Sequence, residues 1–547
     1  MLYRGGVVHS AADPFAEALV VADGRVAWLG SDDSTHTVLD GVDEVVDLDG
    51  ALVTPAFVDA HVHVLETALA LTGVDLSAGA GVTTLAAALD RVAAAARGLP
   101  SGDPLLGHGW DETAWPEGRP PTRAELDRAA PGRPVYLART DVHAAVVSTA
   151  LADAAGLARL AGWREDGRLT DDAHRAARAT TRRPAPHVRE GLYRAALSAM
   201  AAQGVVSVHE HSAPSFDTRD GLAALLALTA DAASGLPLVV GYRAELVRDA
   251  EAARELLAAV PGLTGIGGDL TVDGSLGSWT AALREPYADR PDTRGTLELT
   301  ADDVAAHLAA TGLVGAQAAF HAIGDRALDV VLDGVRTGLA GPDTRAVRAV
   351  ATRVEHAEMA DAAAVAALAS LGLSASVQPL FDARWGGPDG MYARRLGAER
   401  AERLNPFADL AAAGVPLALG SDSPVTPVDP WATVGAALHH RTPAQRITAR
   451  AAFRAHTRGG WRLARLEHLG AGEIRVGAPA HLAFWDAPTL TVQAPDAGRA
   501  AWSTDQRAGS PLLPALPEPE ALGSADRPRC LRTLRDGVLL HDVLGDR

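Results

Sequence analysis

The middle of the chain alternates short apolar segments with longer, alanine-rich amphipathic segments, and this alternation constrains the fold more than any other feature. Repeated strand–helix units of this kind build a parallel sheet covered by helices. The predicted strands are residues 53–58, 205–209, 238–244, 268–272, 315–320, 353–355, 373–377 and 416–420. Eight strands in series fit a closed (β/α)8, TIM-type barrel. An open doubly wound sheet is the alternative, but no glycine-rich dinucleotide loop follows the first strand.

At both ends of the chain, the sequence pattern instead predicts short strands separated by turns. Ala22-Asp23-Gly24 is a tight-hairpin signal between two apolar segments. Residues 480–485 and 533–540 have a similar character near the other end. We therefore predict a small β-sandwich domain built from residues 1–53 and 470–547, beside a barrel formed by residues 54–469. The proline-rich residues 509–519 are predicted to be a linker or surface loop.

The segment between the first two predicted barrel strands is far longer than an ordinary βα loop. We predict that residues 66–202 form an inserted, mostly helical cap with its own strands near Leu105 and Val135. A length of 547 residues accommodates a barrel, this insertion and a companion domain.

Charge and composition exclude several classes of partner. The net charge of −18 would repel nucleic acids and anionic membranes, so we expect a small-molecule substrate. The single cysteine, Cys530, excludes an internal disulfide and a thiolate-rich zinc site. The first residues lack the pattern of a signal peptide, and apolar stretches are shorter than a membrane span. A cytoplasmic protein is the expectation, and a homodimer is the commonest assembly.

His61 and His63 follow an apolar segment and are two residues apart. Side chains alternate between the faces of a strand, so these two imidazoles point to the same side. At the carboxyl end of a barrel strand, such a pair can share a metal ion. A bare His-x-His pattern is common, however, and the same pair could lie on a solvated strand end.

The segments around the His61–His63 pair, and others along the chain, favour a metal-binding role for these two histidines. The run from Thr54 to His63 reads TPAFVDAHVH, and six further segments follow in order. Together they resemble the amidohydrolase superfamily, in particular its YtcJ-like branch, which includes N-substituted formamide deformylases. The segments are Arg139-Thr140-Asp141-Val142-His143, Asp273-Gly274-Ser275-Leu276-Gly277-Ser278, His321-Ala322-Ile323-Gly324-Asp325-Arg326-Ala327, Arg353-Val354-Glu355-His356-Ala357, Ser376-Val377-Gln378-Pro379 and Gly420-Ser421-Asp422-Ser423-Pro424-Val425.

The resemblance implies a metal centre, with zinc as the expected divalent ion. His61, His63, His321 and His356 would be ligands at strand ends. Asp422 would contact the metal and act as general base, because a metal-bound water with a pKa near ~7 gives up its proton readily. The alternative for Asp422 is a turn or helix-capping residue.

The fourth strand departs from the family pattern. Relatives usually carry a carboxylated lysine four residues before Asp-Gly, which bridges two metals, but this chain has Asp269 there and contains no lysine. Aspartate is also an oxygen ligand, although its shorter side chain cannot span the same gap unless the backbone moves. Two arrangements remain: two ions joined through Asp269 or Glu210, or one ion held by the histidines and Asp422. The short side chain favours the second slightly.

Four further residues match segments that the family keeps near its substrate: Trp110, Asp111, His143 and Gln378. Trp110 could equally belong to the core of the cap. His209 and Glu210 end the second predicted strand and are expected to line the pocket.

The expected reaction is hydrolysis of a non-peptide C–N bond, in an amide or N-formyl amine. Deamination or opening of a cyclic amide on the same metal centre is an alternative. A non-catalytic, metal-poor scaffold is a third, supported only by the missing lysine and opposed by the four histidines and Asp422.

Overall fold

The computed structural model describes residues 1–100, 102–181, 184–491, 511–516, 518 and 527–546. At its centre lies a sheet of eight parallel strands whose order follows the sequence. The N–H of Asp422 donates to the carbonyl of His61 (2.8 Å), and the N–H of His63 donates to that of Ser423 (3.0 Å), so the last strand returns to the first. The predicted barrel is confirmed. Its strands are β7 (Phe57–Val62), β13 (Val205–Ser212), β14 (Leu238–Arg243), β15 (Gly265–Ile266), β16 (Gln317–Ala322), β17 (Arg353–His356), β18 (Ser374–Val377) and β19 (Leu417–Leu419).

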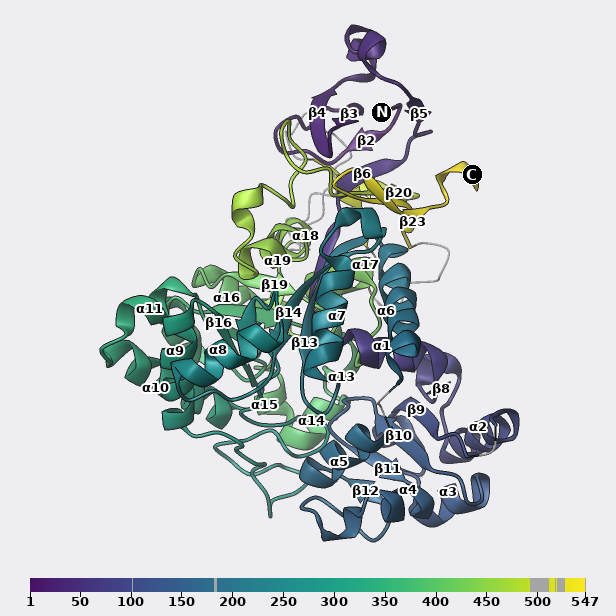
Figure 1. Cartoon of the computed structure of the whole chain (residues 1–547), viewed down its shortest axis with the longest axis vertical. Helices are drawn as coiled ribbons and strands as arrows, with labels where there is room; N and C mark the ends of the chain where they lie inside the picture. Colours follow the sequence, from purple (N-terminus) through teal and green to yellow (C-terminus); the bar gives the residue numbers. More distant parts are fainter. Residues whose placement is uncertain (101, 182–183, 492–510, 517, 519–526, 547) are drawn as a thin grey trace.

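Helices surround this sheet in Figure 1. Helix α9 shows how the sequence sets their limits: Thr300 and Asp303 form a capping box at its start, and Gly315, with φ of +76°, ends it. The helices outside the cap are α1 (Val64–Thr72), α6 (Pro186–Ala201), α7 (Arg219–Thr229), α8 (Ala250–Ala259), α9 (Ala301–Val314), α10 (Asp325–Ala340), α11 (Thr344–Ala349), α12 (Ala362–Leu371), α13 (Pro379–Trp385), α14 (Met391–Leu396), α15 (Ala398–Ala401), α16 (Phe407–Ala412), α17 (Pro430–Leu438), α18 (Ala449–Ala455) and α19 (Arg458–Leu463).

For two of the predicted strands, the structure shows a different secondary structure from the one expected. The prediction of a strand at residues 268–272 is wrong, because β15 ends at Ile266 and the next two glycines, Gly267 and Gly268, have φ values of +124° and +79°. The apolar run predicted as the first strand is in fact two strands. Its first half, β6 (Leu52–Pro55), pairs within the small domain, and the barrel begins with β7.

The two ends of the chain meet in a small β-sandwich, at the top of Figure 1, as predicted. One sheet has the order β4-β3-β1-β5, and the other, β2-β6-β20-β23-β24, combines strands from both ends. Tyr3, Leu19, Phe484 and Leu531 are among the buried residues of their shared core. The strands are β1 (Leu2–Arg4), β2 (Val7–Val8), β3 (Ala18–Ala22), β4 (Arg25–Gly30), β5 (Val45–Asp47), β20 (Leu482–Asp486), β23 (Arg529–Arg535) and β24 (Val538–Asp542).

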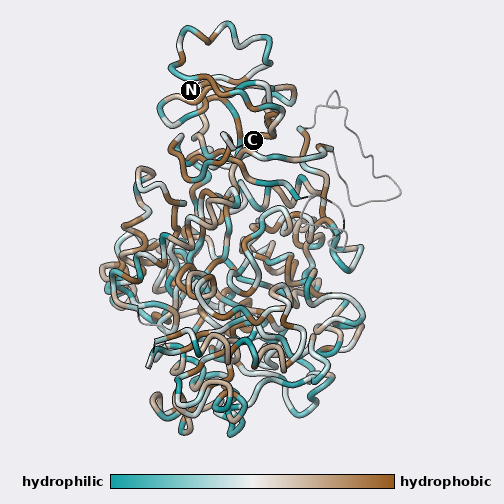
Figure 2. The backbone as a smooth tube through the Cα atoms, turned by 90° about the vertical axis from the view of Figure 1, so that its right-hand side faces the viewer, coloured by the Kyte–Doolittle hydropathy of each residue, from teal (hydrophilic) through white to brown (hydrophobic). Residues whose placement is uncertain are grey.

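The second sheet of the sandwich also contacts the barrel, because Trp485 and Cys530 belong to the main barrel core. Both termini lie in the upper part of the molecule in Figure 2. The predicted linker at residues 509–519 lies partly outside the described residues. Its described part forms β22 (Leu513–Pro514), which pairs with β21 (Leu490–Thr491).

The segment between β7 and β13 carries a sheet of its own, at the lower right of Figure 1. Helices α1 and α6, near its two ends, pack against each other and share the core of the barrel. Across the described residues of the segment there are five strands, more than the two predicted. They are β8 (Val74–Asp75), β9 (Leu105–Trp110), β10 (Val135–Arg139), β11 (Ala145–Val147) and β12 (Arg168–Leu169), accompanied by helices α2 (Leu85–Gly98), α3 (Arg123–Ala129), α4 (Thr149–Ala154) and α5 (Asp171–Thr181).

Across the described residues, no helix combines the length and the apolar character that crossing a lipid bilayer requires.

Candidate metal centre and active site

Histidine and aspartate side chains converge where barrel strands end. This carboxyl-terminal end is the side on which barrel enzymes build their active sites. Each of the side chains is at most about a tenth exposed, so the cluster lies almost entirely inside the protein. The residues are His61 and His63 at the end of β7, Asp269 after β15, His321 in β16, His356 at the end of β17 and Asp422 after β19.

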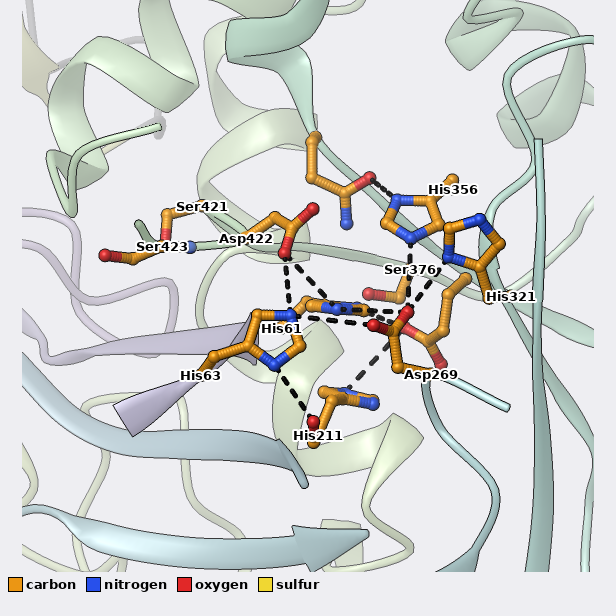
Figure 3. A network of polar contacts seen from close by, with 12 residues as sticks. His61, His63, His211, Asp269, His321, His356, Ser376, Ser421, Asp422 and Ser423 are labelled. Atoms are coloured by element: carbon orange, nitrogen blue, oxygen red, sulfur yellow. Dashed lines mark hydrogen bonds and ion pairs between the residues drawn. The ribbon is translucent and has the colours of Figure 1, made fainter. Parts of the chain in front are cut away.

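Asp269 lies at the middle of this cluster, with His61 and His63 on one side of it and His321 and His356 on the other (Figure 3). Its Oδ1 is 3.0 Å from His321 Nδ1, 3.7 Å from His356 Nε2 and 3.9 Å from His61 Nε2. Its Oδ2 is 3.7 Å from His63 Nε2. Burial alone would raise the pKa of Asp269, but the hydrogen bonds and charges of His321 and His356 hold it well below its ordinary value. A single carboxylate therefore faces all four histidines.

Two glycines bring Asp269 to this position. A Cβ on Gly267 would lie 2.1 Å from the carbonyl oxygen of Ala319, and one on Gly268 would lie 2.3 Å from His211 Nδ1. Both residues also have positive φ, which other residues adopt rarely. The main chain can thus turn inward directly after β15, which compensates for the short aspartate side chain.

Asp422 lies beside the His61 and His63 rings. Its Oδ1 is 3.1 Å from His63 Nε2 and 3.5 Å from His61 Nε2. Burial would raise the pKa of Asp422, but the neighbouring histidines lower it below its ordinary value. Asp422 and His356 both have positive φ, +54° and +70°, a conformation that non-glycine residues tolerate mainly where the surroundings impose it.

The rings of three histidines are oriented by hydrogen bonds on their Nδ1 side. His61 donates to Glu355 Oε2, His63 to the carbonyl of His211 and His356 to Gln378 Oε1. The donor–acceptor distance is 2.9 Å in each case. Because these partners accept, the proton of each neutral ring is on Nδ1, and Nε2 presents its lone pair to the centre.

The residues present fit a metal ion. His61 Nε2, His356 Nε2 and Asp422 Oδ1 are buried and have no hydrogen-bond partner among the described residues. Buried polar atoms normally have a partner, so three that face one point indicate a missing ligand. Ligand atoms about 2 Å from a shared zinc ion lie roughly 3–4 Å apart. In each of the sets His61–His356–Asp422, His61–His63–Asp269 and Asp269–His321–His356, the ligand atoms all lie within 4.8 Å of one another.

Glu355 is itself held in place by a buried arginine. Arg353 donates to Glu355 through Nε (2.6 Å) and Nη2 (2.9 Å), and both side chains are fully buried. Burial would raise the pKa of Glu355, but Arg353 keeps it well below its ordinary value. An ionised Glu355 can only accept hydrogen bonds, so it fixes the proton of His61 on Nδ1.

We expect Glu355→Gln to weaken metal binding by about 10–100-fold, because an amide no longer enforces the His61 tautomer. The measurement is metal content per chain after dialysis against graded chelator concentrations. The exposed Glu467→Gln is the matched control. Unchanged metal affinity in a folded Glu355→Gln protein would show that His61 does not depend on this partner.

Two recesses open beside the cluster. The aromatic pocket is lined by apolar side chains together with His321, His356 and Asp422, and its walls include Ile323, Phe381, Trp385, Met391, Tyr392 and Val425. The polar pocket adjoins Asp269 and is lined by His174, Arg175, Arg178, Phe216 and Glu298, among others. His143 lines both, so it stands between them. A substrate bound at the cluster can therefore extend in two chemically different directions.

His143 belongs to the inserted segment between β7 and β13, the cap, and its side chain lies beside the cluster. Its ring centroid is 5.3 Å from that of His321. The preceding Asp141 accepts hydrogen bonds from Ser275 and Ser278, 2.7 Å each, and ties the cap loop to the loop after β15. Burial lowers the pKa of His143 to about 4, so the ring is neutral at physiological pH.

The other predicted substrate contacts lie elsewhere. Trp110 is fully buried in the core of the cap and donates from Nε1 to the carbonyl of Leu137. Asp111 pairs with Arg139 and caps a short turn. Neither residue lines the aromatic pocket or the polar pocket. Gln378 does reach the cluster through His356, and its Nε2 has no partner among the described residues.

His211 was not among the predicted site residues, and Glu210 does not line the aromatic pocket or the polar pocket. The His211 ring stacks on that of His61, with centroids 3.9 Å apart and planes 8° apart, and its carbonyl orients His63. Glu210 turns away and accepts from the N–H of Val64 (2.6 Å), while burial raises its pKa to about 7. His209 contacts Arg353 rather than a pocket. The signal was present, since β13 reads His209-Glu210-His211 with alternating faces.

A parallel (β/α)8 barrel with buried histidines and carboxylates at its strand ends defines the class of metal-dependent hydrolases. The family model described as "Amidohydrolase family" matches residues 44–540. The chain belongs to the amidohydrolase family.

The sequences of several relatives align with most of this chain. The putative amidohydrolase YtcJ of Bacillus subtilis is 28% identical over 80% of this chain and 83% of its own length. The N-substituted formamide deformylase of Arthrobacter pascens is 26% identical over 81% and 85%, and the protein LONG AFTER FAR-RED 3 of Arabidopsis thaliana is 28% identical over 83% and 81%. An uncharacterized metal-dependent hydrolase from Pyrococcus furiosus has a similar structure, with a TM-score of 0.68, 28% identity and coverage of 88% of this chain and 98% of its own.

Proposed function

We propose that this protein hydrolyses a non-peptide C–N bond, in an amide or N-formyl amine, with Asp422 as general base. The observation that carries the proposal is the buried, unpartnered Asp422 Oδ1 beside the unpartnered Nε2 atoms of His61 and His356. The formamide deformylase relative supports the choice of bond.

The metal that fits these ligands is a divalent ion, and nitrogen donors combined with carboxylate oxygens suit zinc. We propose that Asp269 would help to hold the metal from both sides of the cluster, since one of its oxygens faces His321 and the other faces His63. Bound there, the metal supplies Lewis acidity, which polarises a carbonyl group and makes water more acidic.

The protein's own groups then handle the proton. The pKa of Asp422 is lowered by its histidine neighbours, so the carboxylate is ionised at neutral pH and can accept a proton from the attacking water. The same carboxyl can pass that proton to the departing nitrogen. We propose that the neutral His143, which lines both pockets, contacts the substrate. We propose the same for Gln378, because it hydrogen-bonds His356 and its Nε2 has no partner among the described residues.

Metal analysis combined with a hydrolysis screen tests the proposal. The screen compares N-formyl amines, N-acyl amino compounds and cyclic amides, with Asp422→Asn as the blank. We expect bound zinc in the purified protein and hydrolysis of the acyclic amides that the blank lacks. The absence of bound transition metal, together with unchanged metal content in His61→Ala, would overturn it. Exclusive turnover of cyclic amides would replace it with the cyclic amidohydrolase alternative.

A further inference from the structure

The aromatic pocket begins directly at the metal ligands. The ring of Phe381 stacks on that of His356, with centroids 6.1 Å apart and planes 11° apart. Trp385 follows at 5.0 Å from Phe381, and Tyr392 lies 6.3 Å from Trp385. Helices α13 and α14 therefore present a series of aromatic rings that leads away from the cluster.

Polar atoms without partners are buried in this aromatic surrounding. Glu358 is 3% exposed and Tyr392 is 2% exposed, and both line the pocket. Asn405 adjoins them and donates from its backbone N–H to the carbonyl of Glu358 (2.8 Å). The side chains of Glu358, Tyr392 and Asn405 lie within hydrogen-bonding reach of one another, with Tyr392 between the other two. Among the described residues, however, Glu358 Oε2, Tyr392 OH and Asn405 Nδ2 make no hydrogen bond of standard geometry.

The carboxyl groups of the pocket determine which ligand suits it. Asp422 belongs to the metal cluster, and Asp141 is occupied by Arg139, Ser275 and Ser278. Glu358 is the remaining carboxyl, and no arginine lines this pocket. A carboxylate surrounded by aromatic faces is the arrangement that binds an ammonium group, through a charge-assisted hydrogen bond and cation–π attraction.

We propose that Glu358 and Tyr392 select substrates in which a second, cationic amine lies on the substituent that occupies the aromatic pocket. The ammonium would donate to Glu358 Oε2 and to the Tyr392 hydroxyl oxygen, neither of which makes a hydrogen bond of standard geometry with a described residue. This inference rests on the proposed amide hydrolysis and narrows its substrate class.

Two nearly isosteric formamides test the proposal. Both are N-formylbenzylamines, and the para position carries either an aminomethyl or an ethyl group. We expect the wild type to have a kcat/KM about tenfold or more higher for the aminomethyl compound, because a hydrogen bond to a charged group discriminates by at least that factor. Equal values, or a preference for the ethyl compound, would overturn the proposal.

Variants of Glu358 and Tyr392 test whether these residues cause the preference for the aminomethyl compound. Glu358→Gln keeps the shape of the side chain and should reduce the preference to about threefold or less, while kcat/KM for the ethyl compound stays within about threefold of the wild type. Tyr392→Phe should reduce the preference less. The exposed Glu399→Gln on α15 is the matched control. Equal losses for both compounds in Glu358→Gln would mean that the carboxyl supports the metal centre or the fold, which contradicts the proposal.

A binding measurement separates this inference from the proposed reaction. Calorimetry compares the diamine 4-(aminomethyl)benzylamine with the uncharged, nearly isosteric 1,4-benzenedimethanol on the wild type and on Glu358→Gln. Tighter binding of the diamine by the wild type alone supports the pocket assignment even if neither formamide is hydrolysed, in which case only the proposed function fails. Equal binding by both proteins refutes the assignment whether or not hydrolysis occurs.

Discussion

Replacing Asp422 by asparagine is expected to lower kcat for amide hydrolysis by about 10³-fold, which is within the range for loss of a general base. Asparagine has nearly the same shape, but its amide cannot accept a proton from water at neutral pH. The lowered pKa of Asp422 means that the wild-type carboxylate is already ionised where the enzyme works. The measurement is a steady-state assay on metal-saturated protein, with metal content determined on the same samples.

Metal content decides how the result is interpreted. A loss of activity at full metal occupancy shows that Asp422 transfers the proton, whereas a parallel loss of metal shows that it serves mainly as a ligand. Asp333→Asn on the exposed surface of α10 is the control and should leave both quantities unchanged. Activity within about tenfold of the wild type in Asp422→Asn would contradict its role as general base.

Replacing Asp269 by asparagine is expected to remove roughly half of the bound metal, because a neutral amide is a poor bridge between two cations. Its carboxylate is the one group that faces all four histidines of the cluster, within 3.9 Å of each. Metal content per chain, measured by mass spectrometry of the digested protein, checks this expectation. Thermal unfolding with and without added zinc gives a second readout, since bound metal stabilises the folded state.

The control for Asp269 is Asp302→Asn, an exposed aspartate in the first turn of α9. It should retain the metal content and the zinc-dependent stabilisation of the wild type. Full metal occupancy in Asp269→Asn would contradict the bridging role and favour a single ion held by the histidines and Asp422.

Much of the fold was predictable because most barrel strands are apolar segments bounded by turns. The fourth strand was misplaced for a physical reason: Leu270 and Val272 are buried, but they belong to a loop. Burial gives a loop the same apolar composition as a strand, and only the backbone angles of Gly267 and Gly268 distinguish them. The first strand was misread because one continuous apolar run changes hydrogen-bond partners at Ala56.

The candidate ligands were predictable because their segments are local in sequence and lie at strand ends. The groups that orient these ligands could not be predicted from the sequence. For example, His61 and Glu355 are in contact although they lie 294 positions apart in the chain. For Trp110 the sequence left a substrate contact and a place in the cap core equally open, because a local match to relatives does not specify which way a side chain faces. The structure places Trp110 in the cap core. His211 was overlooked because the predicted strand, residues 205–209, ended three residues before β13 does.

The paired glycines before Asp269 also bear on how such a site can change during evolution. The main chain turns through two glycines of positive φ directly after Ile266, and Asp269 follows them. A Cβ at position 267 or 268 would collide with Ala319 or His211. Substitution of either glycine is therefore expected to require a compensating change in its neighbours, so the position of Asp269 depends on several residues at once.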